Sequence, residues 1–160
     1  MSNFHAKRVT KEYIERIAAP PSTIFPLICP VREYDWLDGW SCNMIYSDSG
    51  VMEDNCVFTT DYLRDGREIW ITTRYEADKF EKESILINPD SRIIRFKVFL
   101  QEGDDNVTEV HWILTITALN EKGNALIDQY TDEVHLMSMG SLGKSLKHFC
   151  ETGTMLKHNL

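Results

Sequence analysis

The sequence predicts an α+β fold in which about seven antiparallel strands are followed by one long C-terminal helix. Short runs of alternating apolar and polar residues are typical of half-buried strands, and seven strand-like runs occur before residue 120. The connectors between them are short, for example Asp65-Gly66 and Asn88-Pro89-Asp90, and short connectors join strands that run antiparallel. No proline interrupts Lys122–Lys157, where apolar residues recur at helical spacing.

The first part of the chain is predicted to hold one strand and two short helices. The strand covers Val9–Ala18 and ends at Pro20-Pro21, because proline has no backbone N–H to donate to a neighbouring strand. Ser22 can cap a short helix that reaches Leu27. Pro30 suits the first turn of a second helical segment, which we expect to run to about Tyr34.

Six further strands are predicted, and most have one apolar and one polar face. In one of them Ile94, Phe96 and Val98 alternate with Arg95 and Lys97, so the sheet is expected to be wet on one side. The faces of Glu68–Tyr75 are less distinct, and either of them could point inward. The six strands are Cys42–Ser47, Cys56–Leu63, Glu68–Tyr75, Phe80–Ile87, Arg92–Gln101 and Val107–Leu119.

The long C-terminal helix is predicted to bury a stripe whose middle is unusually small. A helix that packs on a sheet usually fills such positions with Leu, Ile or Val. Small residues either let the helix approach the sheet closely or leave a space lined by polar groups. We expect Ser138, Ser141 and Ser145 to face the sheet and to line such a space. The stripe comprises Ile127, Tyr130, Val134, Ser138, Ser141, Leu142, Ser145, Phe149 and Leu156.

Composition restricts the class of protein. The 160 residues are expected to form a single domain over residues 1–160, and a net charge of −8 argues against nucleic acid as a partner. No apolar run approaches the roughly 18 residues of a membrane span, and the N-terminal residues lack a signal-peptide core, so we expect a cytoplasmic protein. The four cysteines form no CxxC pair and are expected to be free thiols.

The order of elements, together with the segment Ile14–Cys42 (IERIAAPPSTIFPLICPVREYDWLDGWSC), resembles the SRPBCC superfamily of START-like and polyketide cyclase-like proteins. Cys29–Trp36 followed by Gly39-Trp40 is the most specific piece, and it is similar to the opening of an uncharacterised bacterial subgroup. The resemblance implies a helix-grip fold, in which a curved antiparallel sheet wraps the C-terminal helix around a hydrophobic cavity. It implies a small apolar ligand, such as a lipid or polyketide, without implying one chemistry.

Nine residues form the predicted ligand-binding set. Trp36 and Trp40 can wall one mouth of a pocket, and the aromatic side chains of the strands can wall the side opposite the serines. Arg74 could hold a carboxylate or phosphate group, although we favour an ion pair with Glu81 or Glu83. The set is Trp36, Trp40, Phe58, Arg74, Phe96, Trp112, Ser138, Ser141 and Ser145.

No catalytic residue is assigned from the sequence. Glu33 would become a usable acid or base if it turned inward beside the tryptophans, but pairing with Arg32 or contact with water is favoured. The chain has no HxxxH or HExxH spacing, no GxGxxG, no P-loop and no GxSxG, so no metal and no cofactor is expected.

Three functions remain open: a module that binds a small apolar molecule, a cyclase- or dehydratase-like enzyme, and a protein-interaction domain. The enzyme would use a pocket acid or base such as Glu33, Tyr75 or Arg74. We adopt the binding module and leave a homodimer open.

Overall fold

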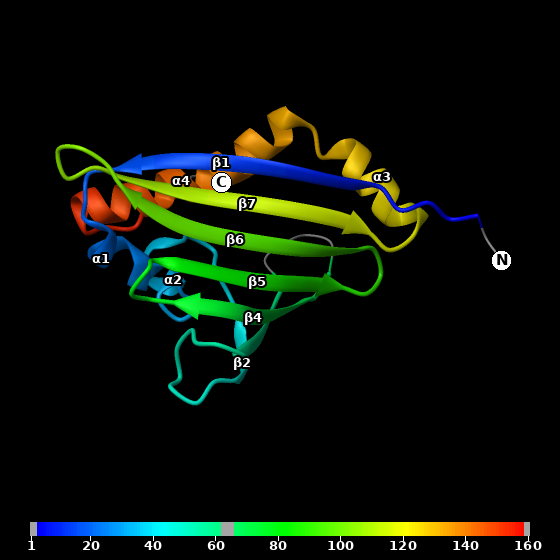
Figure 1. Ribbon diagram of the computed structural model, residues 1–160, viewed down its shortest axis with the longest axis horizontal. Coiled ribbons are helices and arrows are strands. Elements are labelled where there is room, and N and C mark those ends of the chain that lie inside the picture. The colour runs from blue at the N-terminus through cyan, green and yellow to red at the C-terminus, as the bar shows by residue number, and fades with distance from the viewer. Residues whose placement is uncertain (1–2, 62–65, 159–160) are drawn as a thin grey trace.

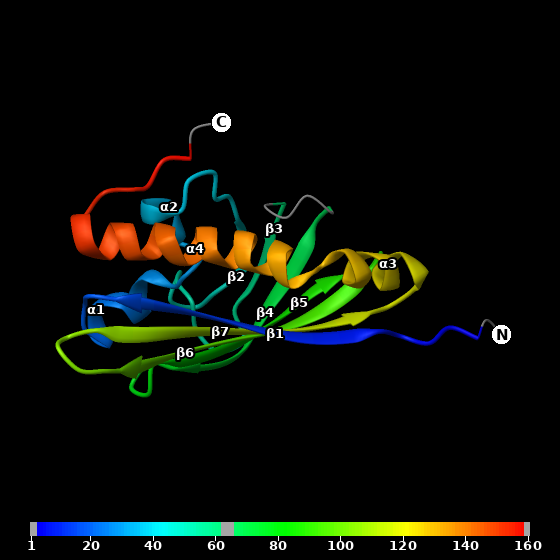
Figure 2. The same ribbon diagram turned by 90° about the horizontal axis from the view of Figure 1, so that it is seen from above.

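The computed structural model describes residues 3–61 and 66–158. One layer is a curved seven-stranded antiparallel sheet, and helices lie on its concave side (Figures 1 and 2). The predicted α+β helix-grip fold is therefore confirmed. The elements are β1 (Arg8–Ile17), α1 (Pro21–Ile24), η1 (Phe25–Leu27), α2 (Glu33–Trp36), β2 (Asn43–Tyr46), β3 (Val57–Thr60), β4 (Glu68–Glu76), β5 (Glu81–Asn88), β6 (Arg92–Glu102), β7 (Thr108–Ala118), α3 (Glu121–Gln129) and α4 (Asp132–Thr152).

The strands follow the order β1-β7-β6-β5-β4-β3-β2, so the first strand lies beside the last. β1 pairs with β7 over its whole length, from Arg8 opposite Thr117 to Ile17 opposite Thr108. This pairing confirms the expected contact between the two ends of the strand order. From β2 to β7, each strand pairs antiparallel with the next strand along the chain, as the short connectors predict. Most of the Asp65-Gly66 turn lies outside the described residues.

The prediction of one uninterrupted C-terminal helix is wrong, because the helix is interrupted at Tyr130-Thr131. Thr131 is extended, and its side chain accepts a hydrogen bond from the backbone N–H of Val134. A threonine in this role caps a new helix rather than continuing the old one. The helix α4 then ends at Gly153, whose φ of 75° is the left-handed conformation that glycine adopts readily.

The break also changes which side of α4 faces the sheet. The buried residues of α4 are His135, Met139, Gly140, Gly143, Ser145 and Leu146, so only one of the three predicted serines is among them. The predicted stripe assumes one continuous helix from Ile127 onward. Because α4 is a new helix that starts at Asp132, the helical spacing cannot be counted across the break. The close approach is made instead by the two glycines Gly140 and Gly143, which lie against Tyr13 of β1.

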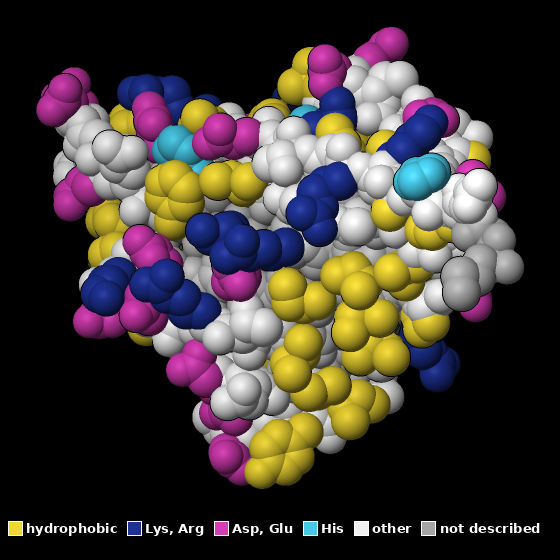
Figure 3. Space-filling model, turned by 45° about the vertical axis from the view of Figure 1, so that its right-hand side comes forward, with side chains coloured by type: hydrophobic (Ala, Val, Ile, Leu, Met, Phe, Trp, Pro, Cys, Tyr) yellow, Lys and Arg dark blue, Asp and Glu magenta, His cyan; other side chains and the backbone are white. Residues whose placement is uncertain are grey.

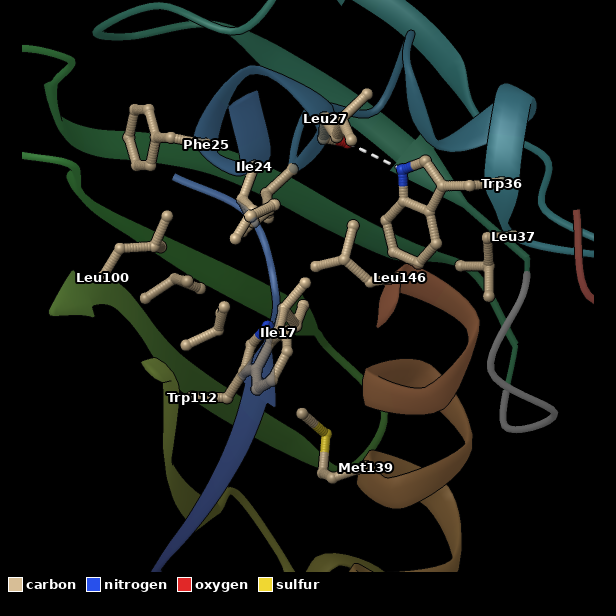
Figure 4. Close-up of a cluster of buried hydrophobic side chains, with 14 residues drawn as sticks. Ile17, Ile24, Phe25, Leu27, Trp36, Leu37, Leu100, Trp112, Met139 and Leu146 are labelled. Carbon is tan, nitrogen blue, oxygen red and sulfur yellow. Dashed lines mark hydrogen bonds between the residues drawn. The ribbon is translucent and has the colours of Figure 1, made fainter. Parts of the chain in front are cut away.

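A packed hydrophobic core fills one end of the space between the two layers (Figure 4). Trp112 of β7 and Leu146 of α4 are almost fully buried there, together with Ile17 and Ile24. Trp36 closes this end and donates its indole N–H to the carbonyl of Leu27 at 2.8 Å. Burying a side chain of this size contributes several kcal/mol by area, roughly 25 cal/mol per Å².

A β-bulge settles which face of β4 points inward. The register between β4 and β5 shifts between Thr72 and Arg74, so Thr72 and Tyr75 both lie on the concave face. Ile69 and Arg74 then point to the convex side.

Aliphatic side chains gather on the convex side of β3 to β6, and a continuous hydrophobic area lies there below a band of Lys and Arg side chains (Figure 3). The convex face of the sheet is therefore only partly polar. The outward-facing aliphatic residues of these strands are Val57, Ile69, Ile71, Ile85, Ile87 and Ile93.

Replacing the two glycines of α4 should have opposite effects on stability. A Cβ on Gly143 would lie 2.7 Å from the Tyr13 ring and 2.8 Å from the Glu15 carboxylate, whereas one on Gly140 would lie 3.8 Å from the Tyr13 hydroxyl. We expect Gly143→Ala to lower the free energy of unfolding by about 1–3 kcal/mol through overpacking. Gly140→Ala should raise it by up to about 1 kcal/mol through helix propensity. Urea denaturation of both variants checks this, and equal effects would contradict the packing described.

Candidate functional site

The helices leave part of the concave face open. α4 packs chiefly along β1 at one edge of the sheet, and α3 packs on β7. Three large side chains of the concave face are only partly buried although they point toward the helices, namely Trp70, Phe96 and Leu114. A solid core would bury residues of this kind almost completely. We call this region, together with the polar groups at its two ends, the concave site.

An aromatic wall forms one side of the concave site. The Phe58 ring stacks on Trp70 with centroids 5.1 Å apart, and Phe96 meets Trp70 edge-on at 6.1 Å. The indole N–H of Trp70 donates to the Thr60 hydroxyl at 3.1 Å, which fixes the ring. Such rings bury large area and orient flat apolar molecules.

Small polar side chains form the centre of the sheet beneath this wall. Thr72 lies opposite Ser84, and Ser84 lies opposite Phe96 on the next strand. The Cys56 thiol lies 3.2 Å from the Thr72 hydroxyl. The small side chains between the sheet and the helices are thus on the sheet, whereas the sequence analysis expects them on the C-terminal helix.

A buried lysine lies at one end of the concave site. Lys82 precedes Ser84 on the inward face of β5 and is only 6% exposed. Its Nζ donates to the carbonyl of Ile28 at 2.8 Å and lies 3.4 Å from the Met52 sulfur. Ile28 is the residue that follows η1, so the lysine satisfies a carbonyl that the end of the helix leaves unpaired. Burial lowers the pKa of Lys82, and the nearby charge of Glu33 opposes this shift.

Glu33 of α2 lies beside this lysine. Burial raises its pKa from 4.5 to about 7, and attraction to Lys82 partly offsets that rise. The favoured sequence interpretation is wrong on the Arg32 pair, because Arg32 pairs with Asp35 at 2.8 Å. Glu33 is instead half-buried, and a carboxyl group with a pKa near neutral pH can exchange protons there.

A buried ion pair lies at the opposite end of the concave site. Arg92 donates to the Glu68 carboxylate at 2.9 Å, and both side chains are less than a tenth exposed. Arg92 also donates to the Ser91 hydroxyl at 3.3 Å. The apolar wall is thus bracketed by polar groups at both ends, an arrangement that suits a ligand with an apolar body and polar ends.

Phe58 and Phe96 of the predicted set lie in the concave site. Trp112 and Trp36 belong to the packed core beside it. Trp40 is half-buried, packs near Cys29 and Met52, and donates its indole N–H to the carbonyl of Pro30 at 2.8 Å.

Arg74 lies on the convex side, away from the concave site. Its guanidinium pairs with Glu76 and lies 3.3 Å from the Glu81 carboxylate. This arrangement confirms the favoured ion pair with Glu81, and the bulge is its physical cause because it turns residue 74 outward.

The three serines of α4 do not line the sheet side together. Ser138 is exposed, and Ser141 borders an open groove of about 460 Å³ on the outer side of α4. Ser145 is buried, but its hydroxyl donates to the carbonyl of Ser141 and contacts His158 of the C-terminal segment. The expectation that all three face the sheet is therefore wrong, and the helix break explains it.

Sequence reasoning misses the polar residues of the sheet, above all Lys82, Ser84 and Thr72. The signal lies in the alternation of Lys82 and Ser84 with Glu83 and Ile85. The face of this strand that carries Ile85 and Ile87 points outward. Hydrophobicity alone would therefore select the wrong face as the inward one.

No protein-family model matches the chain. No curated protein matches it either. The fold does match solved structures. Ara h 8.0201 is 15% identical, with a TM-score of 0.64, covering 91% of this chain and 99% of that one.

Norcoclaurine synthase from Thalictrum flavum, in complex with dopamine and hydroxybenzaldehyde, is 9% identical, with a TM-score of 0.69 and coverage of 90% and 87% of the two chains. A protein of unknown function from Staphylococcus aureus is 12% identical, with a TM-score of 0.68 and coverage of 92% and 96%. At these identities the likeness concerns the fold. The likeness agrees with the helix-grip fold that the sequence resemblance implies.

Two further findings concern metals and membranes. Within residues 3–61 and 66–158, no three His, Cys, Asp or Glu side chains are placed to share a metal ion. No helix in this described part of the chain has the length and hydropathy to cross a membrane.

The charge of Glu33 should make the protein less stable as the pH rises. Between pH 4.5 and about 7 the folded chain holds a proton on Glu33 that the unfolded chain has lost. The free energy of unfolding then falls across this interval. Glu33→Gln should remove that part of the slope, whereas Asp35→Asn, on an exposed position of the same helix, should keep it. Urea titrations at several pH values measure the slopes, and parallel slopes for wild type and Glu33→Gln would contradict the burial of this carboxyl.

Proposed function

We propose that the chain binds a small hydrophobic molecule, of lipid, polyketide or aromatic type, in the concave site. The observation that carries this proposal is the incomplete burial of Trp70, Phe96 and Leu114 on the face that points toward the helices. Large apolar side chains that remain open to solvent inside a two-layer fold are typical of a ligand site. Phe58 adds a second ring to the same wall.

The solved structures of the same fold support this choice. Norcoclaurine synthase was crystallised with dopamine and hydroxybenzaldehyde, which are small aromatic molecules. An aromatic ligand of that size would match the Phe58, Trp70 and Phe96 rings. A cytoplasmic location would suit the chain, whose four cysteines are free thiols.

An enzyme is the second candidate, favoured by one observation. Glu33, with a pKa of about 7, lies near the buried amine of Lys82 at one end of the concave site. A carboxyl group poised near neutral pH can act as an acid and as a base in the same cycle. Of the pocket acids and bases that the sequence suggests, Glu33 and Tyr75 lie inward, whereas Arg74 does not.

Native mass spectrometry of the purified protein, before and after denaturing extraction, tests the binding function. A co-purifying small molecule lost on extraction would support it. Tryptophan fluorescence with an added aromatic probe then locates the site, because Trp70→Phe should remove most of the change that binding causes. No bound molecule and no fluorescence response to lipid or aromatic probes would contradict the proposal.

Adding bulk at the centre of the concave site should weaken binding without unfolding the protein. We expect Ser84→Leu to weaken probe binding by about tenfold or more, at about 1.4 kcal/mol per factor of ten, and to keep or raise the melting temperature. In a solid core the same change would lower stability by about 1–3 kcal/mol. Thr115→Leu adds similar bulk on the convex face of β7 and serves as the control. A destabilised Ser84→Leu variant whose binding is intact would refute the site.

A further inference from the structure

Lys82 carries a buried amine, and the binding of an apolar ligand does not explain why a lysine lies there. Lysine is among the residues least often buried, because its ammonium group is costly to remove from water. A capping role for the carbonyl of Ile28 would need one donor, which an asparagine or serine side chain could also supply. The inference below rests on the proposed function, since it names a ligand class for the same concave site.

The contacts of Nζ fit a neutral amine. Two acceptors are within reach, the carbonyl oxygen of Ile28 at 2.8 Å and the weakly accepting sulfur of Met52 at 3.4 Å. A neutral amine has two N–H groups and one lone pair, so these partners use both donors and leave the lone pair free. Among the described residues, no carboxylate oxygen lies within 4 Å of Nζ to hold a third proton.

The groups that face Lys82 come from several elements. Glu33 approaches from α2, Tyr75 lies opposite on β4, and the thiols of Cys29 and Cys56 act on the amine from the Met52 side. Glu33 and Tyr75 are half-buried, so the lysine lies close to solvent-accessible side chains. An amine with a carboxyl group and a phenol beside it has the parts that reversible addition to a carbonyl group needs.

We infer that Lys82 forms an imine with a small apolar aldehyde or ketone held in the concave site. The amine lone pair forms a bond to the carbonyl carbon, the carbonyl π pair moves to oxygen, and a proton passes from nitrogen to that oxygen. The carbinolamine then loses its hydroxyl as water, with a proton supplied by the Glu33 carboxylic acid, and the nitrogen lone pair completes the C=N bond. The proton released from nitrogen returns to Glu33, so the sum is carbonyl compound plus amine giving imine plus water.

Reductive trapping tests this inference on the whole protein. Benzaldehyde with sodium cyanoborohydride converts an imine into a stable benzyl amine, which peptide mapping by mass spectrometry locates. We expect Lys82 to be labelled about tenfold or more faster than Lys79, an exposed lysine in the turn between β4 and β5. Label on exposed lysines with none on Lys82 would overturn the inference.

Variants separate chemistry from folding. Lys82→Met should lose the fast labelling, and Lys79→Met should keep it. If Lys82→Met does not fold, the peptide map of the unmodified chain still decides the outcome. Glu33→Gln should slow labelling of Lys82 by about 100-fold at saturating benzaldehyde, so that weaker binding does not account for the loss. An unchanged labelling rate in that variant would overturn the role of Glu33.

A binding measurement keeps this inference distinct from the proposed function. Benzyl alcohol has the size of benzaldehyde but no carbonyl group, so its effect on Trp70 fluorescence reports binding alone. Binding of benzyl alcohol without labelling of Lys82 by benzaldehyde would overturn the imine and leave the binding function standing. Absence of both would overturn both.

Discussion

The pairing of β1 with β7 is the constraint on which the rest of the structure depends. It joins the first strand to the last over ten residues and fixes the edge along which α4 packs. Gly140 and Gly143 let the helix approach Tyr13 of that edge strand closely. Because α4 is held at the β1 edge, it does not cover the middle strands, and the concave face of β4 to β6 stays partly open.

The open region places two opposing demands on the same strands. Apolar rings on β3, β4 and β6 contribute to stability when water is excluded, whereas Lys82 and the Glu68–Arg92 pair lose hydration in the same interior. A solid core would favour hydrophobic residues at those positions, since replacing a buried ion pair by apolar side chains is often stabilising. Polar groups at both ends of an aromatic wall therefore suit the binding function proposed above.

Sequence patterning predicts the strand order, the antiparallel pairing and the inward face of β6, because strict alternation over Ile94, Phe96 and Val98 leaves one solution. It does not predict the inward face of β4, since the bulge after Thr72 moves Arg74 outward. It also misses the break before α4, where the side chain of Thr131 caps a new helix. Phe58 and Phe96 could be predicted, whereas Lys82 could not, because Ile85 and Ile87 make the opposite face of its strand the more apolar one.

The convex aliphatic residues explain that last failure in physical terms. β-branched side chains fit a half-buried sheet surface, so Ile85 and Ile87 can favour the strand where they face outward. The inward positions of the same strand are then free to carry Lys82 and Ser84.

Lys82 in turn holds the carbonyl of Ile28, immediately before the Cys29–Trp36 segment that carries the most specific sequence resemblance. That segment supplies Glu33 to the lysine and Trp36 to the core, so one hydrogen bond connects the sheet, the two short helices and the polar end of the concave site.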